Sequence, residues 1–255
     1  MKNKLISLFI CLMALGLAFS GVAVQAAEAP PPVVLETFAC NYHDGKDMDD
    51  LLSARDYMVK QAGKAGLSLA PGYVWSKYKG GPDLDHIWFT VHESLAAFAA
   101  ESEAFGSAPE LAGVGARFDT VASCDSNIAM ARAIFQGSEA GPPVGSAFIS
   151  SNACMFHDGV DASDMADLEG HLAGVLGEMS AYNSTTFISA TPFTSGPDSA
   201  DVYLFSINAS QSAWAAGVTA FQASASGPAL LRHLNSLLDC DTSLWFSEQV
   251  VGEAD

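Results

Sequence analysis

The stretch ACNYHDGKD, residues 39–47, has a near copy, ACMFHDGVD, at residues 153–161. In both copies a cysteine stands three residues before a His-Asp-Gly sequence. The copies lie more than one hundred residues apart, an interval far too long for the short repeats of a solenoid. The sequence therefore indicates two duplicated domains.

The duplication extends beyond the quoted stretch at a nearly constant offset. Matched pairs are Phe89 with Phe205, Ser94 with Ser210, Phe98 with Trp214, and Cys124-Asp125 with Cys240-Asp241. We therefore divide the chain into a first unit, residues 33–137, and a second unit, residues 146–251. The segment 138–145 between them is rich in Gly and Pro and is predicted to be a linker.

The N-terminus has the pattern of a secretory signal peptide. Lys2 and Lys4 precede an apolar run, and small residues follow as far as Ala26. A charged start, an apolar core and a small-x-small cleavage site predict removal of residues 1–26. Residues 27–32 are then a disordered N-terminal segment. We expect a periplasmic or secreted protein with no membrane attachment after cleavage.

The charge of the chain excludes some partners. It has 11 Lys and Arg against 29 Asp and Glu, a net charge of −18 at pH 7. Nucleic acids and anionic membrane surfaces attract basic proteins, so neither is an expected partner. The acidity is strongest in the second half, where Arg232 is the only Lys or Arg after residue 140.

Hydrophobic periodicity and turn residues predict the same order of elements in both units. In the first unit we expect strands at 33–42, 71–79, 86–92 and 127–135, with helices at 48–63, 94–103 and 110–122. In the second unit we expect strands at 146–156, 185–193, 201–208 and 242–251, with helices at 162–178, 210–222 and 228–238. The shared order, β-α-β-β-α-β, is the ferredoxin-like split motif.

Two such units in tandem resemble the dimeric α/β-barrel superfamily, in which two ferredoxin-like units pack around a shared barrel. The cysteine and His-Asp-Gly motifs also resemble those of a group of uncharacterised secreted bacterial proteins. The fold class implied is α+β, with two tandem units forming an intramolecular α/β barrel. Because one chain supplies both units, we expect a monomer.

Four cysteines remain after signal cleavage, and an even number in an exported chain indicates disulfides. Four cysteines allow three pairings. The resemblance chooses among them, because the first and last strands of a ferredoxin-like sheet are neighbours. It implies bridges Cys40–Cys124 and Cys154–Cys240. No C-x-x-C pair is present, so no metal site is predicted.

The two His-Asp-Gly sequences have two interpretations. As turn chemistry, glycine supplies a positive φ and aspartate bonds to its own backbone, while Asp47 or Asp161 caps the following helix. As functional groups, His43 and His157 serve as acid, base or ligand, with Asp as the orienting partner. A metal shared between the two copies would require them to converge.

A second group of candidates lies on two strands of the first unit. Alternation places polar and aromatic side chains on one face of 86–92, and that face forms half of a pocket if it lines the barrel. The alternative is an ordinary half-buried strand. The candidates are Tyr73, Trp75, His86, Trp88 and His92.

The sequence has no P-loop, dinucleotide fingerprint, nucleophile elbow or H-E-x-x-H motif. We favour a non-catalytic protein that binds a small apolar or aromatic ligand between the two sheets, with no cofactor. Two enzyme classes follow from the resemblance. One is a cofactor-independent oxygenase, and the other is a haem-handling protein with His86 or His92 as axial ligand.

Overall fold

The computed structural model describes residues 31–141, 145–194 and 199–252. The predicted signal peptide, residues 27–30 and linker residues 142–144 lie outside the described residues. The first unit contains β1 (Val33–Tyr42), α1 (Met48–Ala65), β2 (Gly72–Gly80), β3 (His86–His92), α2 (Leu95–Ser107), η1 (Pro109–Leu111), α3 (Val114–Asp119) and β4 (Ala122–Gln136).

The second unit repeats this order. It contains β5 (Ser146–Phe156), α4 (Ala162–Gly177), η2 (Ser180–Tyr182), β6 (Thr185–Pro192), β7 (Val202–Asn208), α5 (Gln211–Ala223), α6 (Gly227–Leu237) and β8 (Leu238–Val251). Each unit is ferredoxin-like, with the fourth strand beside the first, as the sequence predicted.

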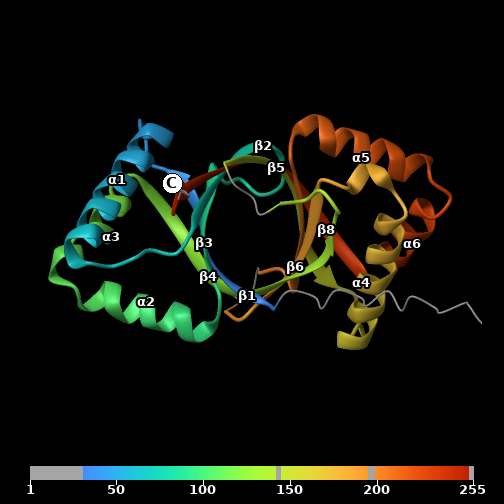
Figure 1. The fold of residues 1–255 in the computed structure, drawn as a ribbon, viewed down its shortest axis with the longest axis horizontal. Helices are drawn as coiled ribbons and strands as arrows, with labels where there is room; N and C mark the ends of the chain where they lie inside the picture. The colour runs from blue at the N-terminus through green and yellow to red at the C-terminus, as the bar shows by residue number, and fades with distance from the viewer. Residues whose placement is uncertain (1–30, 142–144, 195–198, 253–255) are drawn as a thin grey trace, which may run out of the picture.

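The eight strands form one closed barrel in the order β1-β3-β2-β8-β5-β7-β6-β4. The two units join twice, through antiparallel pairing of β2 with β8 and of β4 with β6. The helices lie outside the barrel, α1 to α3 at one end of the molecule and α4 to α6 at the other (Figure 1). Closure leaves no edge strand exposed.

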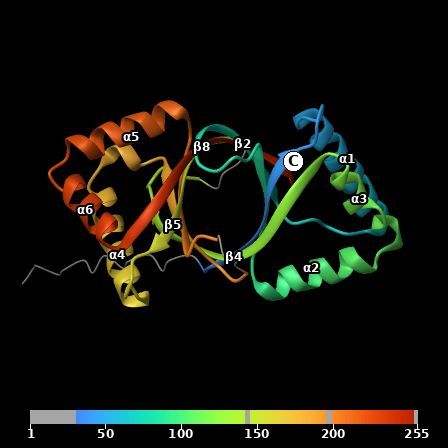
Figure 2. The same ribbon diagram turned by 180° about the vertical axis from the view of Figure 1, so that it is seen from behind.

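The longest strands, β4 and β8, end the two units and cross the middle of the molecule (Figure 2). Each begins earlier than the sequence predicted, at Ala122 and Leu238 in place of 127 and 242. These first segments, Ala122–Ser126 and Leu238–Asp241, are short and contain few of the β-branched and aromatic residues typical of strands. Each of these strands is lengthened by pairing with the first strand of its own unit. The backbone pairing continues as far as Tyr42 with Ala122 in the first unit and Phe156 with Leu238 in the second.

Both predicted disulfides are present. Cys40 lies directly opposite Cys124 on neighbouring strands, with 4.1 Å between their Cα atoms. Cys154 lies opposite Cys240 in the same way, at 4.0 Å. Each bridge joins the first and last strands of its own unit. Two disulfides are typical of proteins that fold in an oxidising compartment.

Capping side chains fix the starts of the helices. Asp47 accepts hydrogen bonds from the backbone of Asp49 and Asp50 at the start of α1. Asp161 and Asp164 form a reciprocal capping box at the start of α4. These contacts satisfy amide groups that the first turn of a helix leaves unpaired. Among the described residues, no helix is both long and apolar enough to cross a membrane.

Candidate functional site

Trp75 lies inside the barrel, where side chains of both units meet. Its ring centroid is 4.8 Å from Phe89 and 5.1 Å from Phe205, edge to face in both contacts. Trp245 and Ile149 are buried in the same cluster. Tyr73, the other candidate on β2, stacks on Phe89. Aromatic side chains therefore occupy the space between the sheets in which we had expected a ligand.

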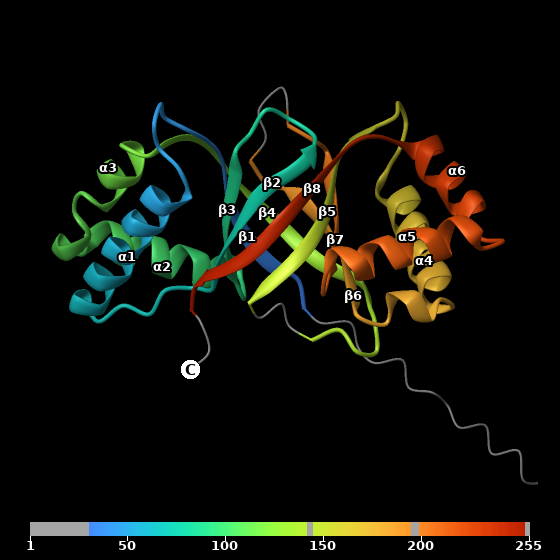
Figure 3. The same ribbon diagram turned by 90° about the horizontal axis from the view of Figure 1, so that it is seen from above.

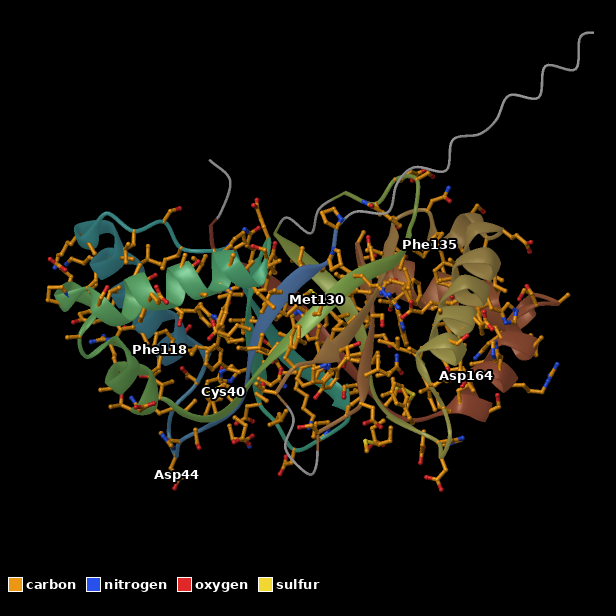
Figure 4. The ribbon with its side chains drawn as sticks, turned by 90° about the horizontal axis from the view of Figure 1, so that it is seen from below. Cys40, Asp44, Phe118, Met130, Phe135 and Asp164 are labelled. Carbon is orange, nitrogen blue, oxygen red and sulfur yellow. A yellow bond between two sulfur atoms is a disulfide. The ribbon has the colours of Figure 1, made fainter. Side chains whose placement is uncertain are left out.

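His86, Trp88 and His92 lie on the opposite face of β3, under the helices of the first unit. The register pairs Val74 with Trp88, and directly opposite residues share a face of the sheet. The Trp88 ring packs on Phe118 of α3, which Figure 4 labels between the helices and the sheet. This face therefore does not meet the condition for half of a pocket, which was that it line the barrel, since alternation alone does not fix the phase of neighbouring strands.

His86 is fully buried and neither of its ring nitrogens has a hydrogen-bond partner. The ring stacks on Tyr42 with 4.5 Å between centroids. Burial lowers the pKa of His86 to about 4, and the nearby Asp85 carboxylate opposes this shift. His86 is therefore neutral at pH 7, in a packed environment that leaves no space for a haem beside it.

His92 belongs to a polar network that ties α2 to the sheet. Its Nε2 lies 3.0 Å from Thr90 Oγ1, which also lies 3.3 Å from Glu36 Oε2. Its Nδ1 lies 3.5 Å from Glu101 Oε2 on α2, and Glu101 also accepts from the backbone of Ala70. Burial raises the pKa of Glu36. No residue of α2 is fully buried, and the helix is held by this network together with the half-buried Phe98, whose ring packs edge-on against His92, and Phe105.

The His-Asp-Gly sequences form turns, as one of the two interpretations predicted. Gly45 and Gly159 have φ of 76° and 88°, values that favour glycine. His43 Nε2 lies 2.9 Å from the carbonyl of Asp119, and His157 Nδ1 lies 3.1 Å from that of Ser236. In each unit the histidine joins the turn to the segment before the last strand. Figure 4 shows Asp44 at the outer tip of its turn, away from the barrel.

A cavity of about 620 Å³ lies in the second unit, between the outer face of the sheet and α4, α5 and α6. Figure 3 shows these helices together beyond β5 and β8. The sheet gives the cavity a mainly polar floor, to which Phe187, Leu238, Asp239 and Cys240 also belong, and the helices give it a mainly apolar wall that includes Asn235. Floor residues are Ser150, Asn152, Ser206, Asn208 and Thr242; wall residues are Leu172, Leu176, Trp214, Val218, Phe221, Leu231 and Leu234.

Most of the polar groups on the floor are already paired with protein. Asn208 donates to the Phe148 carbonyl and accepts from Thr185, and Thr242 donates to Asn152. These bonds hold the floor in place.

Tyr182 also lines the cavity. Its ring is buried and packs on Phe187, and the structure gives its hydroxyl no partner among the described residues. Burial raises the pKa of Tyr182 to about 12, so the hydroxyl keeps its proton at neutral pH. Gly217 makes room for the ring, because a Cβ there would lie 2.8 Å from Tyr182 Cε1.

The first unit fills the corresponding space with large side chains. On β1 and β3, Phe38 pairs with Trp88, whereas the same register in the second unit pairs Asn152 with Leu204. Phe118, which packs on Trp88, stands three residues before Val121, whose carbonyl accepts a hydrogen bond from the backbone of His43. In the second unit the carbonyl of Leu237 accepts the equivalent bond from the backbone of His157. The second unit has Leu234 at the matching position. Smaller side chains at three matched positions thus accompany the cavity.

The fold places the histidine candidates in different parts of the molecule. His157 lines the cavity, whereas His43, His86 and His92 belong to the first unit. Among the described residues, no group of three or more His, Cys, Asp or Glu side chains is arranged to hold a metal ion. Sequence reasoning missed Tyr182 and the leucines of the cavity wall. Comparing the two units position by position would have found the loss of bulky residues.

No protein-family model matches the sequence. No curated protein matches it either. Solved structures do resemble it. A protein provisionally assigned as a chlorite dismutase has a TM-score of 0.53 at 10% identity, over 86% of this chain and 95% of that one.

Two further structures show the same likeness. A protein of Fusobacterium nucleatum provisionally assigned as a monooxygenase has a TM-score of 0.54 at 10% identity, over 86% of this chain and 93% of its own. A dye-decolorizing peroxidase of Bacteroides thetaiotaomicron has a TM-score of 0.52 at 7% identity, over 88% of this chain and 95% of its own. The likeness concerns the fold alone, a closed α/β barrel built from two ferredoxin-like units, as the sequence indicated.

Proposed function

We propose that the protein binds a small, mainly apolar molecule in the cavity of the second unit. The observation that carries this proposal is the cavity itself, about 620 Å³ with an apolar wall and a polar floor. Ligand sites typically have several hundred Å³ of mostly apolar lining and a few placed polar groups. We propose this cavity as the ligand site instead of the space between the two sheets, because Trp75 and its neighbours fill that space.

The free hydroxyl of Tyr182 adds a chemical preference. A neutral phenol in an apolar wall donates one hydrogen bond. An aromatic or aliphatic ligand with a single carbonyl or ether oxygen would satisfy it. Leaving this donor unpaired in a desolvated complex would cost about 1–3 kcal/mol. We therefore expect the site to prefer ligands with one acceptor over plain hydrocarbons.

A fluorescent neutral ketone, 6-propionyl-2-dimethylaminonaphthalene, tests both statements. We expect saturable binding with one site per chain, detected by the blue shift of its emission. The double substitution Asn152→Phe/Leu234→Phe copies the bulk of the first unit and should weaken binding at least tenfold. Leu95→Phe, at a position 44% exposed on α2, is the matched control and should change nothing.

Tyr182→Phe removes the donor and keeps the ring. It should weaken binding of the ketone about fivefold, since one hydrogen bond contributes about 1 kcal/mol. Unchanged binding by the filled variant would show that the probe sits elsewhere and would reject the proposal. Native mass spectrometry of the protein from its own periplasm would identify a molecule that co-purifies.

Haem handling is the second candidate, and His157 is the observation that favours it. Its Nδ1 is held by the Ser236 carbonyl, so Nε2 remains for another partner. Metal-ligating histidines are commonly oriented in this way. The residues that line the cavity include no Lys or Arg to pair with haem propionates, which weighs against this candidate.

Titration with haemin separates the two candidates. A haem site at His157 predicts a red-shifted Soret band that His157→Ala abolishes and His43→Ala, its counterpart in the first unit, preserves. Absence of a shifted band in the unaltered protein would reject haem handling and leave the first proposal standing. The cofactor-independent oxygenase class rests on fold likeness alone and has no residue to test.

A further inference from the structure

A pair of histidines lies outside the cavity, on the seam between two helices. His171 of α4 and His233 of α6 approach with 3.1 Å between their Nδ1 atoms. The helices pack side by side at one end of the molecule (Figures 1 and 3). Both side chains are half-buried, so solvent reaches the pair. Neither residue takes part in the proposed ligand site.

We propose that His171 and His233 form a two-histidine site for a transition-metal ion, Zn²⁺ or Cu²⁺, which clips α4 to α6. Imidazole nitrogen is a favoured ligand of both ions. Zn–N bonds are about 2.0–2.1 Å long, so two nitrogens on one ion lie about 2.9–3.4 Å apart for angles from 90° to tetrahedral. The observed separation of 3.1 Å falls within that range.

The resting contact also suits metal binding. Two ring nitrogens at hydrogen-bond distance require one protonated Nδ1 as donor and one bare Nδ1 as acceptor, so at least one of the two already has a lone pair for a metal. A bare imidazole nitrogen is what binds metal, and an ion between the two rings replaces the shared Nδ1 proton, which moves to Nε2 of the donor ring or is released to solvent. Water completes the coordination, because no third protein ligand lies near the pair in the part of the chain that the structure describes.

The surroundings favour a cation and connect the site to the cavity. Residues 141–255 carry 13 Asp and Glu against a single Lys or Arg, Arg232, which stands next to His233 in the chain, so it is the net charge of the second unit that favours a cation. Leu172 and Leu234, each next to one of the histidines, line the cavity wall. An ion on the seam would hold these two parts of the wall together. The metal site itself does not depend on any ligand occupying the cavity.

Calorimetry on the mature chain, made without a histidine tag and dialysed against chelator, tests the site. We expect one Zn²⁺ per chain, with the thermal midpoint raised by Zn²⁺ and unaffected by Mg²⁺. His171→Gln and His233→Gln should each weaken Zn²⁺ binding at least tenfold. His43→Gln is the matched control, because it removes an exposed histidine from the other unit.

Cu²⁺ gives a spectroscopic check that does not depend on stability. Its electron paramagnetic resonance spectrum should show hyperfine structure from two equivalent nitrogens, reduced to one in either variant. Circular dichroism without metal establishes that the variants fold. Equal Zn²⁺ affinity in the unaltered protein and both folded variants would overturn the proposal, as would no binding at millimolar Zn²⁺.

Discussion

Replacing His86 with leucine should make the protein more stable and less sensitive to acid. His86 is fully buried with both ring nitrogens unpaired. An unsatisfied buried polar group costs about 1–3 kcal/mol, whereas losing the stacked contact with Tyr42 costs about 0.5–1.5 kcal/mol. The second unit places Val202 at the same position opposite its cysteine, so an apolar residue fits the fold there. We expect a net gain of about 1 kcal/mol at pH 7.5.

The pH dependence gives the larger signal. In the unfolded chain His86 titrates near its ordinary value of about 6.5, whereas burial lowers the pKa in the folded protein to about 4. Between these values the unfolded chain binds a proton that the folded protein does not. Stability is therefore full above the unfolded pKa and is lost as the pH falls through this window. The loss at pH 5 should reach about 2 kcal/mol.

Urea unfolding at pH 7.5 and pH 5, followed by circular dichroism, measures both effects. His86→Leu should remove about 2 kcal/mol of the difference between the two pH values. His43→Leu is the matched control, since His43 is exposed, and should leave the pH difference as in the unaltered protein. A His86→Leu protein that loses stability between pH 7.5 and 5 as steeply as the unaltered one would refute the reasoning.

Four further outcomes are expected. Cys154→Ser should destabilise the protein by about 4 kcal/mol, the value for a loop of this length, and should leave Cys240 open to alkylation; equal stability would contradict a structural bridge. His92→Ala should detach α2 and destabilise by about 1–3 kcal/mol, with faster amide exchange in that helix, while Glu93→Ala at the exposed neighbour should not. Light scattering should give the mass of one chain, because one chain closes the barrel; a stable dimer would contradict this. N-terminal sequencing of exported protein should begin after Ala26, and an uncleaved chain would overturn the signal prediction.

The sequence alone was sufficient to predict the duplication, the order of elements and the resemblance to a known fold. Repeated motifs and hydrophobic periods are local features that survive in the printed chain. The pairing of Cys40 with Cys124 then followed, because that fold makes the first and last strands neighbours. The capping role of Asp47 and Asp161 is local too, since it involves only residues two or three positions ahead.

Only the tertiary structure decided which side chains meet. The phase of β2 against β3 depends on the register of the backbone ladder, and it placed Trp75 in the barrel and Trp88 under the helices. The cavity depends on how helices seat on a sheet once bulky residues are missing. His171 and His233 are 62 positions apart in the chain. They come together because two helices pack, and no local pattern in the sequence records that contact.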